Sequence, residues 1–342
     1  MNIKTITEKV IGNQVLELNG GLRNKCYICE DGEKVYFVKM YNREVMYSRH
    51  MSECRCVSEF FITQYLYNRG CPVAQPLYYD VRSQIGIYEY IEAKNLFDYG
   101  KIDFSVCKKV IESISTMHKI PVKTKIGNCK FVPQNGEDIY RYICDSLNFL
   151  AELCDVKFRV DTRWAKKISN YIAQSETRWG NQQLHNGNIL INDEGKIFFC
   201  DFEKIFPHFP QLDLISFLKA REISVTEEKE LLKYYLLYNN ITNHKYFMDV
   251  YDLLFIIDSL RVLKKIYMNQ NGLKVVWIEE KGERKKEYQK ADSTIGLKWN
   301  EQRKESIDVR IKGIFNKVYS DNDYSNYMRC QVYKLLEKGK RI

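Results

Sequence analysis

Apolar and polar residues alternate along the first part of the chain, which is the pattern of half-buried β-strands. The alternation runs through residues 11–41, where Asp31 and Gly32 predict the turn of a hairpin. Residues 46–69 have helical spacing, and a glycine and a proline just beyond would end that helix. Two more strand-like runs follow in residues 76–92. The pattern therefore predicts a small, mostly β lobe that carries one helix.

After Asn95 the spacing of apolar residues becomes mainly helical. The helical segments are 103–120, 137–154, 160–179, 213–224, 227–240 and 249–270. Between the third and the fourth, the short strand-like runs NILIND and KIFFCDF are joined by a Glu-Gly turn. We therefore predict two domains, an N-terminal lobe of residues 1–92 and a helical C-terminal lobe of residues 93–342. The second contains a catalytic-type loop at residues 181–203.

Composition restricts the class of protein. Of the 342 residues, 45% are hydrophobic and 28% are charged, which favours a buried core over disorder. No apolar run is long enough to span a membrane, and the first residues lack the apolar core of a signal peptide. The number of cysteines, eleven, is odd. Together with the lack of a signal-peptide pattern, this indicates reduced thiols and not disulfides. We expect a cytoplasmic protein.

The net charge of +9 suits anionic partners such as nucleotides or nucleic acid. Part of this charge lies in residues 279–306, a dense stretch that also contains acids and has few aromatic residues. That composition favours a solvated face or loop over a nucleic-acid surface. A nucleotide is therefore a better candidate partner than nucleic acid.

Lys39 lies in the apolar run VYFVKMY, where an ammonium group is costly to bury without an acidic partner. At an exposed edge strand there would be no such cost. Lys39 alone therefore does not distinguish a buried site from an edge strand that faces water. It follows a turn that contains Gly20 and Gly21, and it precedes a predicted helix that carries Glu59. Kinases hold nucleotide phosphates with this combination of groups. Glu53 is the rival acid, and we favour Glu59 because it lies nearer the middle of the helix.

An amide and an acid further along the chain could hold a metal ion. Asn188 ends the loop HNGN, and Asp201 follows the apolar strand KIFFC. Oxygen ligands of this kind suit Mg²⁺, which keeps its other positions for phosphate and water. Each residue alone could be a turn former or a cap. The order Lys39, Glu59, Asn188, Asp201 is harder to obtain by accident, and it predicts a magnesium–nucleotide site.

This order of motifs resembles the aminoglycoside phosphotransferase and choline kinase-like family of protein-kinase-like enzymes, most of all its spore-coat-associated and homoserine-kinase-like members. The matching segments within residues 15–260 are GGLRNKCYI, YFVKMY, GCPVAQPL, GIYEYIEAKNL, STMH, HNGNILI, CDFEKI and QLDLISFL. The resemblance implies an α+β, two-lobed protein-kinase-like fold, with ATP and Mg²⁺ as cofactors. It also implies that backbone groups near Glu89, Tyr90 and Ile91 meet the adenine.

One position departs from the pattern of the family, His-Gly-Asp-x-His-x-x-Asn. Counted back from His185 and Asn188, the catalytic Asp falls on Gln183. A slip of two residues would place Asn181 there, and that residue also has no carboxylate. A glutamine can accept a hydrogen bond from a substrate hydroxyl, but it cannot take up a proton at ordinary pH. His185 is expected to tie the loop together by hydrogen bonds.

Two functions therefore stay open. The first is an ATP- and Mg²⁺-dependent phosphotransferase, in which Gln183 orients a small-molecule acceptor. The second is a pseudokinase, a binding or structural protein such as a spore-coat component, which can still bind nucleotide.

Overall fold

The computed structural model describes residues 6, 8–10, 15–18, 24–42, 50, 53–100, 102–153, 162–219, 223–270, 273–280 and 283–290. Contacts between residues divide the chain into two compact units, residues 1–134 with 176–244 and residues 135–175 with 245–342. The domain boundary predicted near residue 92 stays a prediction.

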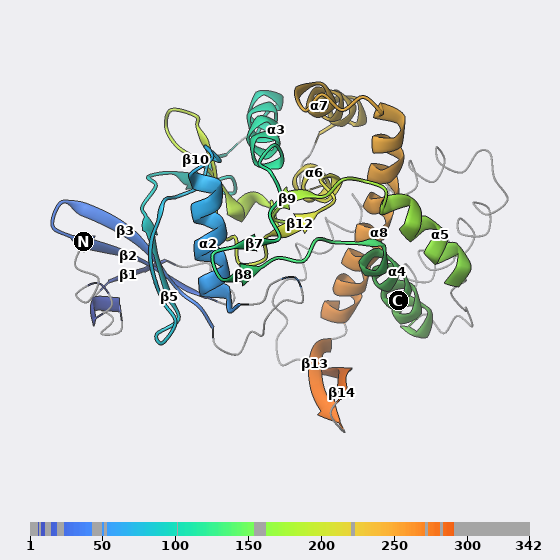
Figure 1. The fold of residues 1–342 in the computed structure, drawn as a ribbon, viewed down its shortest axis with the longest axis horizontal. Helices are drawn as coiled ribbons and strands as arrows, with labels where there is room; N and C mark the ends of the chain where they lie inside the picture. The colour runs from blue at the N-terminus through green and yellow to red at the C-terminus, as the bar shows by residue number, and fades with distance from the viewer. Residues whose placement is uncertain are drawn as a thin grey trace. The chain divides into compact units, whose positions relative to one another are not determined.

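A five-stranded antiparallel sheet forms the N-terminal part of the first unit (Figure 1). Its strands are β1 (Leu16–Leu18), β2 (Lys25–Asp31), β3 (Lys34–Met40), β4 (Pro76–Asp80) and β5 (Ile85–Glu89), in the order β1-β2-β3-β5-β4. The predicted hairpin is present, and Gly32 has a φ of +66° in its turn, a conformation that glycine adopts without strain. Tyr27, Val38 and Ile87 belong to the buried core on one face of the sheet.

Helix α2 (Arg55–Tyr67) packs against β4 and β5. It starts later than the predicted helix, because Cys54 has an extended backbone (φ −61°, ψ 160°) that breaks the helical path before Arg55. His50 lies in a turn and Glu53 in a bend, while residues 46–49 lie outside the described part of the chain. The predicted end near Gly70 is present.

The rest of the first unit combines helices with short strands. Its helices are α3 (Phe104–His118), α6 (Gln211–Leu218) and α7 (Val225–Tyr238), and its strands are β6 (Lys94–Asn95), β7 (Lys125–Ile126), β8 (Cys129–Lys130), β9 (Arg178–Gly180), β10 (Ile189–Ile191), β11 (Ile197–Phe199) and β12 (Phe206–His208). Helix α3 packs against α6, α7, β9 and β11. The sequence predicts the three helices and the β10–β11 hairpin, whereas the other strands are too short to show a period. The helix predicted over residues 160–179 is wrong at its end, because Arg178–Gly180 form β9.

The second unit contains α4 (Gly136–Leu153), α5 (Thr162–Ile172), most of α8 (His244–Gln270), β13 (Leu273–Glu280) and β14 (Glu283–Lys290). The sequence predicts a solvated face or a loop at residues 279–306. The alternative of a loop is wrong for the described part of this range, because β13 and β14 form an antiparallel hairpin there. Val275 pairs with Tyr288, and residues of these types favour strands. Residues 291–306 lie outside the described range.

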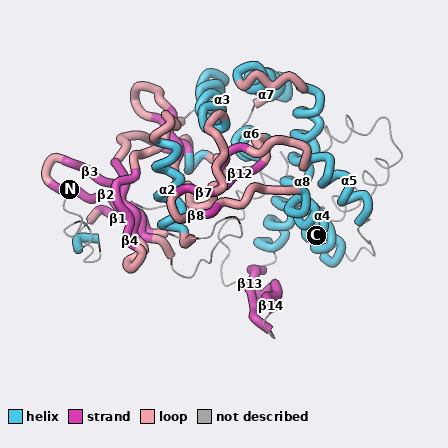
Figure 2. The backbone as a smooth tube through the Cα atoms, in the orientation of Figure 1, coloured by secondary structure: helices cyan, strands magenta, loops and turns pink. Residues whose placement is uncertain are grey.

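Figure 2 shows strands concentrated in the N-terminal sheet and helices prevailing in the later elements, which is the predicted α+β class. Within the part of the chain that the structure describes, none of the helices combines the length and the apolar character needed to cross a membrane.

Candidate functional site

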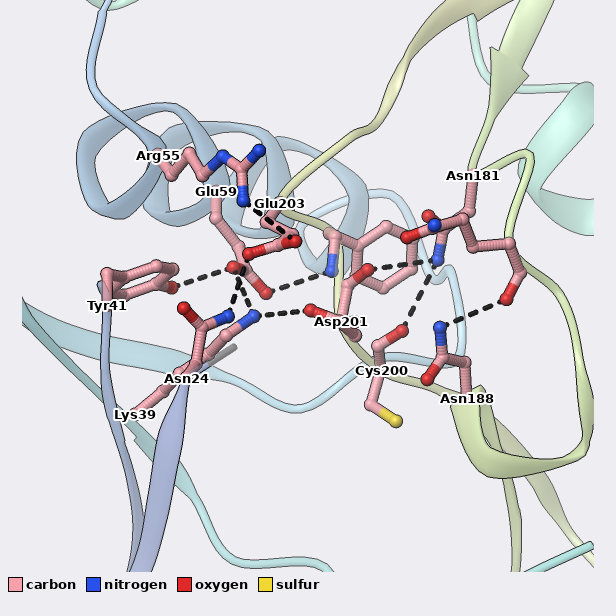
Figure 3. Close-up of polar contacts among 12 residues, drawn as sticks. Asn24, Lys39, Tyr41, Arg55, Glu59, Asn181, Asn188, Cys200, Asp201 and Glu203 are labelled. Carbon is pink, nitrogen blue, oxygen red and sulfur yellow. Dashed lines mark hydrogen bonds and ion pairs between the residues drawn. The ribbon is translucent and has the colours of Figure 1, made fainter. Parts of the chain in front are cut away.

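Lys39 is the centre of a buried ion cluster that joins β3, α2 and the segment after β11 (Figure 3). Its Nζ atom lies 2.8 Å from Glu59 Oε2 and 2.5 Å from Asp201 Oδ1. Lys39 and Glu59 are each only 4% exposed, so the ammonium group depends on these two carboxylates for its charge balance. Glu59, and not Glu53, is therefore the acid that contacts the lysine.

The three charges of this cluster shift one another's pKa values. Burial lowers the pKa of Lys39, but Asp201 and Glu59 outweigh it and hold that pKa well above its ordinary value. Burial would raise the pKa of Asp201, yet the neighbouring ammonium lowers it overall. The pKa of Glu59 is raised, because its burial outweighs the effect of Lys39. The shared ammonium thus opposes the effect of burial on both carboxylates.

Glu59 also organises the polypeptide around the lysine. Its Oε2 atom accepts a hydrogen bond from the Tyr41 hydroxyl at 2.7 Å, and its Oε1 accepts one from the Phe202 amide at 2.9 Å. The Tyr41 and Tyr88 hydroxyls lie 2.8 Å apart. The sequence pattern indicates no special role for Tyr41, although its position two residues after Lys39 in an extended run places it on the same face.

Asn188 and Asp201 come from adjoining ends of the β10–β11 hairpin. Ile189 pairs with Phe199, and the Cys200 amide donates a hydrogen bond to the Asn188 carbonyl at 3.1 Å. Asp201 follows with a φ of +62°, a left-handed conformation that non-glycine residues adopt at local cost and that turns its side chain toward Lys39.

The donor set fits a hard divalent cation. The Nδ2 atom of Asn188 donates to the Gln183 carbonyl at 3.0 Å, which directs the amide and leaves its Oδ1 as an oxygen ligand. Asp201 offers a second oxygen ligand, since only its Oδ1 contacts Lys39. Two protein oxygens, completed by phosphate and water, are typical of Mg²⁺ sites.

Asp213 holds the loop before Asn188 in place. Asp213 lies in the first turn of α6 and is fully buried. Its carboxylate accepts hydrogen bonds from the Asn181 amide at 3.1 Å and from the Gln182 amide at 2.7 Å. It also lies 3.0 Å from His118 Nε2. The backbone that leads into the loop is therefore held by one carboxylate.

The structure places the two candidate positions for the missing acid differently. Asn181 is fully buried, and its Nδ2 donates to the carbonyls of Cys200 and Asp201 at 3.3 and 3.2 Å. Gln183 is partly exposed, and its carbonyl accepts a hydrogen bond from the His185 amide at 2.8 Å. Asn181 thus supports the backbone of the segment that carries Asp201, and Gln183 is the less buried of the two positions. His185 Nδ1 accepts from the Gly187 amide at 3.2 Å, which ties the loop together.

His118 is expected to make the stability of the protein depend on pH. Burial lowers its pKa below the ordinary value of 6.5, and the contact with Asp213 offsets only part of this shift. The unfolded chain therefore binds a proton that the folded chain does not, so the unfolding free energy should fall as the pH drops below about 6.5. We expect urea denaturation to show this loss between about pH 7.5 and pH 5.5, and a smaller loss in a His118→Gln variant. An equal loss in both proteins would contradict the assignment.

Residues 14–246, which include all the groups above, match the sequence model of the phosphotransferase enzyme family. The chain belongs to this family. No curated protein sequence is significantly similar to this phosphotransferase-family chain.

Solved structures of other phosphotransferases share the fold. An ethanolamine kinase from Plasmodium vivax is 14% identical, with a TM-score of 0.53 over 74% of this chain and 75% of that one. A choline/ethanolamine kinase family protein from Mesorhizobium loti is 12% identical, with a TM-score of 0.54 over 96% and 92% of the two chains. A spectinomycin phosphotransferase in complex with ADP and spectinomycin is 14% identical, with a TM-score of 0.50 over 98% and 96%. At these identities the likeness shows the protein-kinase-like fold alone.

The other predicted site residues are Gly20, Gly21, Glu89 and Ile91. Gly20 and Gly21 lie outside the described residues, so their predicted contact with phosphate stays a prediction. Glu89 ends β5 with an exposed side chain, and its amide donates to the Gln75 carbonyl at 2.9 Å. Ile91 follows in the adjoining loop, half buried. Their predicted contact with adenine is likewise untested.

Proposed function

We propose that the chain is an ATP- and Mg²⁺-dependent phosphotransferase that acts on a small molecule. The observation that carries the proposal is the contact of Lys39 Nζ with both Glu59 and Asp201 at 2.8 and 2.5 Å, beside the hairpin end that carries Asn188. A phosphate-binding lysine next to two metal-type oxygen ligands is the arrangement that phosphoryl transfer requires. Membership of the phosphotransferase enzyme family supports the same reaction class.

The residues take the following roles in this proposal. Lys39 binds the nucleotide phosphates, and Glu59 holds the lysine in place. Asn188 and Asp201 hold the metal ion, and Gln183 accepts a hydrogen bond from the acceptor hydroxyl. Bound Mg²⁺ would neutralise charge on the phosphates. The structure of a spectinomycin phosphotransferase with ADP supports a nucleotide as the partner of this fold.

Thermal unfolding in the presence of ATP and Mg²⁺ tests the proposal. A ligand at a hundred times its dissociation constant stabilises the folded state by about 2.7 kcal/mol, so the wild-type melting temperature should rise by several degrees. Asp201→Ala should abolish the part of this rise that depends on Mg²⁺, because it removes a metal ligand. Asp193→Ala, at the exposed turn of the same hairpin, should keep it. A wild-type melting temperature that ATP and Mg²⁺ leave unchanged would refute nucleotide binding.

A second function, that of a pseudokinase, is favoured by one specific observation. The loop of residues 180–188 contains amides and a histidine but no carboxylate, so the usual general base is missing. A spore-coat or other structural role, in or near the cytoplasm, would belong to this second function. Nucleotide binding without any phosphoryl transfer to water or to a panel of metabolites would favour it.

A further inference from the structure

Glu203, two residues after Asp201, has both of its carboxylate oxygens engaged by the N-terminal part of the chain (Figure 3). Its Oε1 accepts from Arg55 Nη1 at 3.0 Å, and its Oε2 accepts from Asn24 Nδ2 at 2.7 Å. Glu203 is 3% exposed. The carboxylate therefore lies away from solvent, with a protein donor on each oxygen.

The two partners of Glu203 belong to different elements. Arg55 is the first residue of α2, the helix that carries Glu59. Asn24 directly precedes β2, and its Oδ1 accepts from the Asn42 amide beyond the end of β3 at 3.2 Å. One carboxylate thus joins the start of α2 and the start of β2 to the segment that carries Asp201.

Electrostatics explain why an acid is needed at this position. Arg55 places a positive charge at the N-terminus of a helix, where the helix dipole disfavours cations and favours anions. Its side chain is 10% exposed, so the charge has little water to stabilise it and depends on a carboxylate. The Glu203 carboxylate compensates for both effects. Since Arg55 requires this charge, the acid is not free to serve a metal ion.

The segment 201–203 therefore makes three successive contacts with the N-terminal elements. Asp201 contacts Lys39 on β3, the Phe202 amide donates to Glu59 in the middle of α2, and Glu203 binds the first residue of that helix. The first two contacts fix the cluster itself. The third fixes the orientation of α2 relative to the segment, and so the spacing of the cluster.

We propose that Glu203 is a positioning residue, and not a metal ligand, for the nucleotide site. Its contacts with Arg55 and Asn24 hold α2 and β2 against the metal-binding segment, which sets the distances among Lys39, Glu59 and Asp201. This inference rests on the proposed function, because the site that it positions is the proposed nucleotide site.

Calorimetric titration with ADP tests the proposal on Glu203→Gln, at saturating Mg²⁺ and then across a series of Mg²⁺ concentrations. The variant leaves Arg55 without its carboxylate, so α2 and the phosphate-binding Lys39 lose part of their positioning, and ADP affinity should fall by about tenfold, which corresponds to about 1.4 kcal/mol. The factor by which saturating Mg²⁺ increases ADP affinity over that without Mg²⁺ should stay unchanged. A smaller factor, as in Asp201→Ala, would identify Glu203 as a metal ligand and overturn the inference.

A double variant separates positioning from metal binding even if Glu203→Gln folds poorly. Arg55→Gln combined with Glu203→Gln removes both charges and lets the two amides hydrogen-bond to each other. We expect it to recover part of the lost ADP affinity. A metal ligand would not be rescued in this way, so a double variant as weak as or weaker than Glu203→Gln would count against the inference.

Glu137→Gln is the matched control. It breaks a carboxylate–arginine pair of similar length, Glu137 with Arg141 at 3.1 Å, in which both side chains are more than half exposed. It should leave ADP affinity unchanged. If the wild-type protein binds ADP and Glu203→Gln binds it equally well, only this inference fails. If the wild-type protein does not bind ADP at all, the proposed function fails with it.

Discussion

Replacing Asp213 with alanine is expected to lower the unfolding free energy by about 3–5 kcal/mol, because it removes one partner from a buried charged network. The carboxylate is fully buried and accepts hydrogen bonds from the amides of Asn181 and Gln182. Burial would raise its pKa, but His208 and His118 more than offset this and hold the pKa well below its ordinary value. Without the carboxylate, the buried amide of Asn181, the partly buried amide of Gln182 and the His118 imidazole lose their acceptor.

Urea denaturation measures this loss, with Glu137→Ala as the exposed control. Asp213→Asn should lose less than Asp213→Ala, since its amide oxygen still accepts from one or both backbone amides. A change within about 1 kcal/mol for Asp213→Ala would mean that water replaces the carboxylate, and would contradict the view that it fixes the loop.

The sequence predicts the elements that are long enough to show a period. Helix α3 and the β2–β3 hairpin repeat their apolar positions several times, so their existence follows from the sequence alone. Strands β9 and β12 have three residues each and are defined by pairing across the chain, Pro207 with Trp179, which no local pattern encodes. The start of α2 is a similar case, because the break at Cys54 is a backbone conformation without a capping side chain.

The candidate site likewise contains residues that a local pattern indicates and contacts that only packing creates. Lys39, Asn188 and Asp201 could be found because each ends or interrupts an apolar run with a group that needs a partner. Their joint order also indicates one shared chemistry. The contacts of Glu203 could not be predicted, because its partners Arg55 and Asn24 lie 148 and 179 residues away in the sequence. Long-range pairs of this kind depend on packing, which only the structure shows.

Replacing Gln183 with aspartate is expected to raise the rate of phosphoryl transfer by about a hundredfold, within the usual range for a general base. The surrounding loop is already organised for such a residue. The Gln183 carbonyl accepts hydrogen bonds from the His185 amide and from Asn188 Nδ2, so its backbone is held beside the metal-type ligand. The carboxylate would accept the proton of the attacking hydroxyl, while Lys39 and Asp201 would keep the roles at the phosphates that are proposed for them.

Gln183→Asn is the matched control, because it has the length of aspartate but cannot take up a proton. ADP formation from ATP and Mg²⁺, with water and with a panel of small hydroxylated and amino-bearing acceptors, gives kcat and KM for each protein. A higher kcat in the aspartate variant alone, at similar KM, indicates a base that acts in the transition state. If both variants bind ATP and Mg²⁺ but transfer no phosphoryl group, the site lacks more than the acid. The chain would then act as a nucleotide-binding pseudokinase.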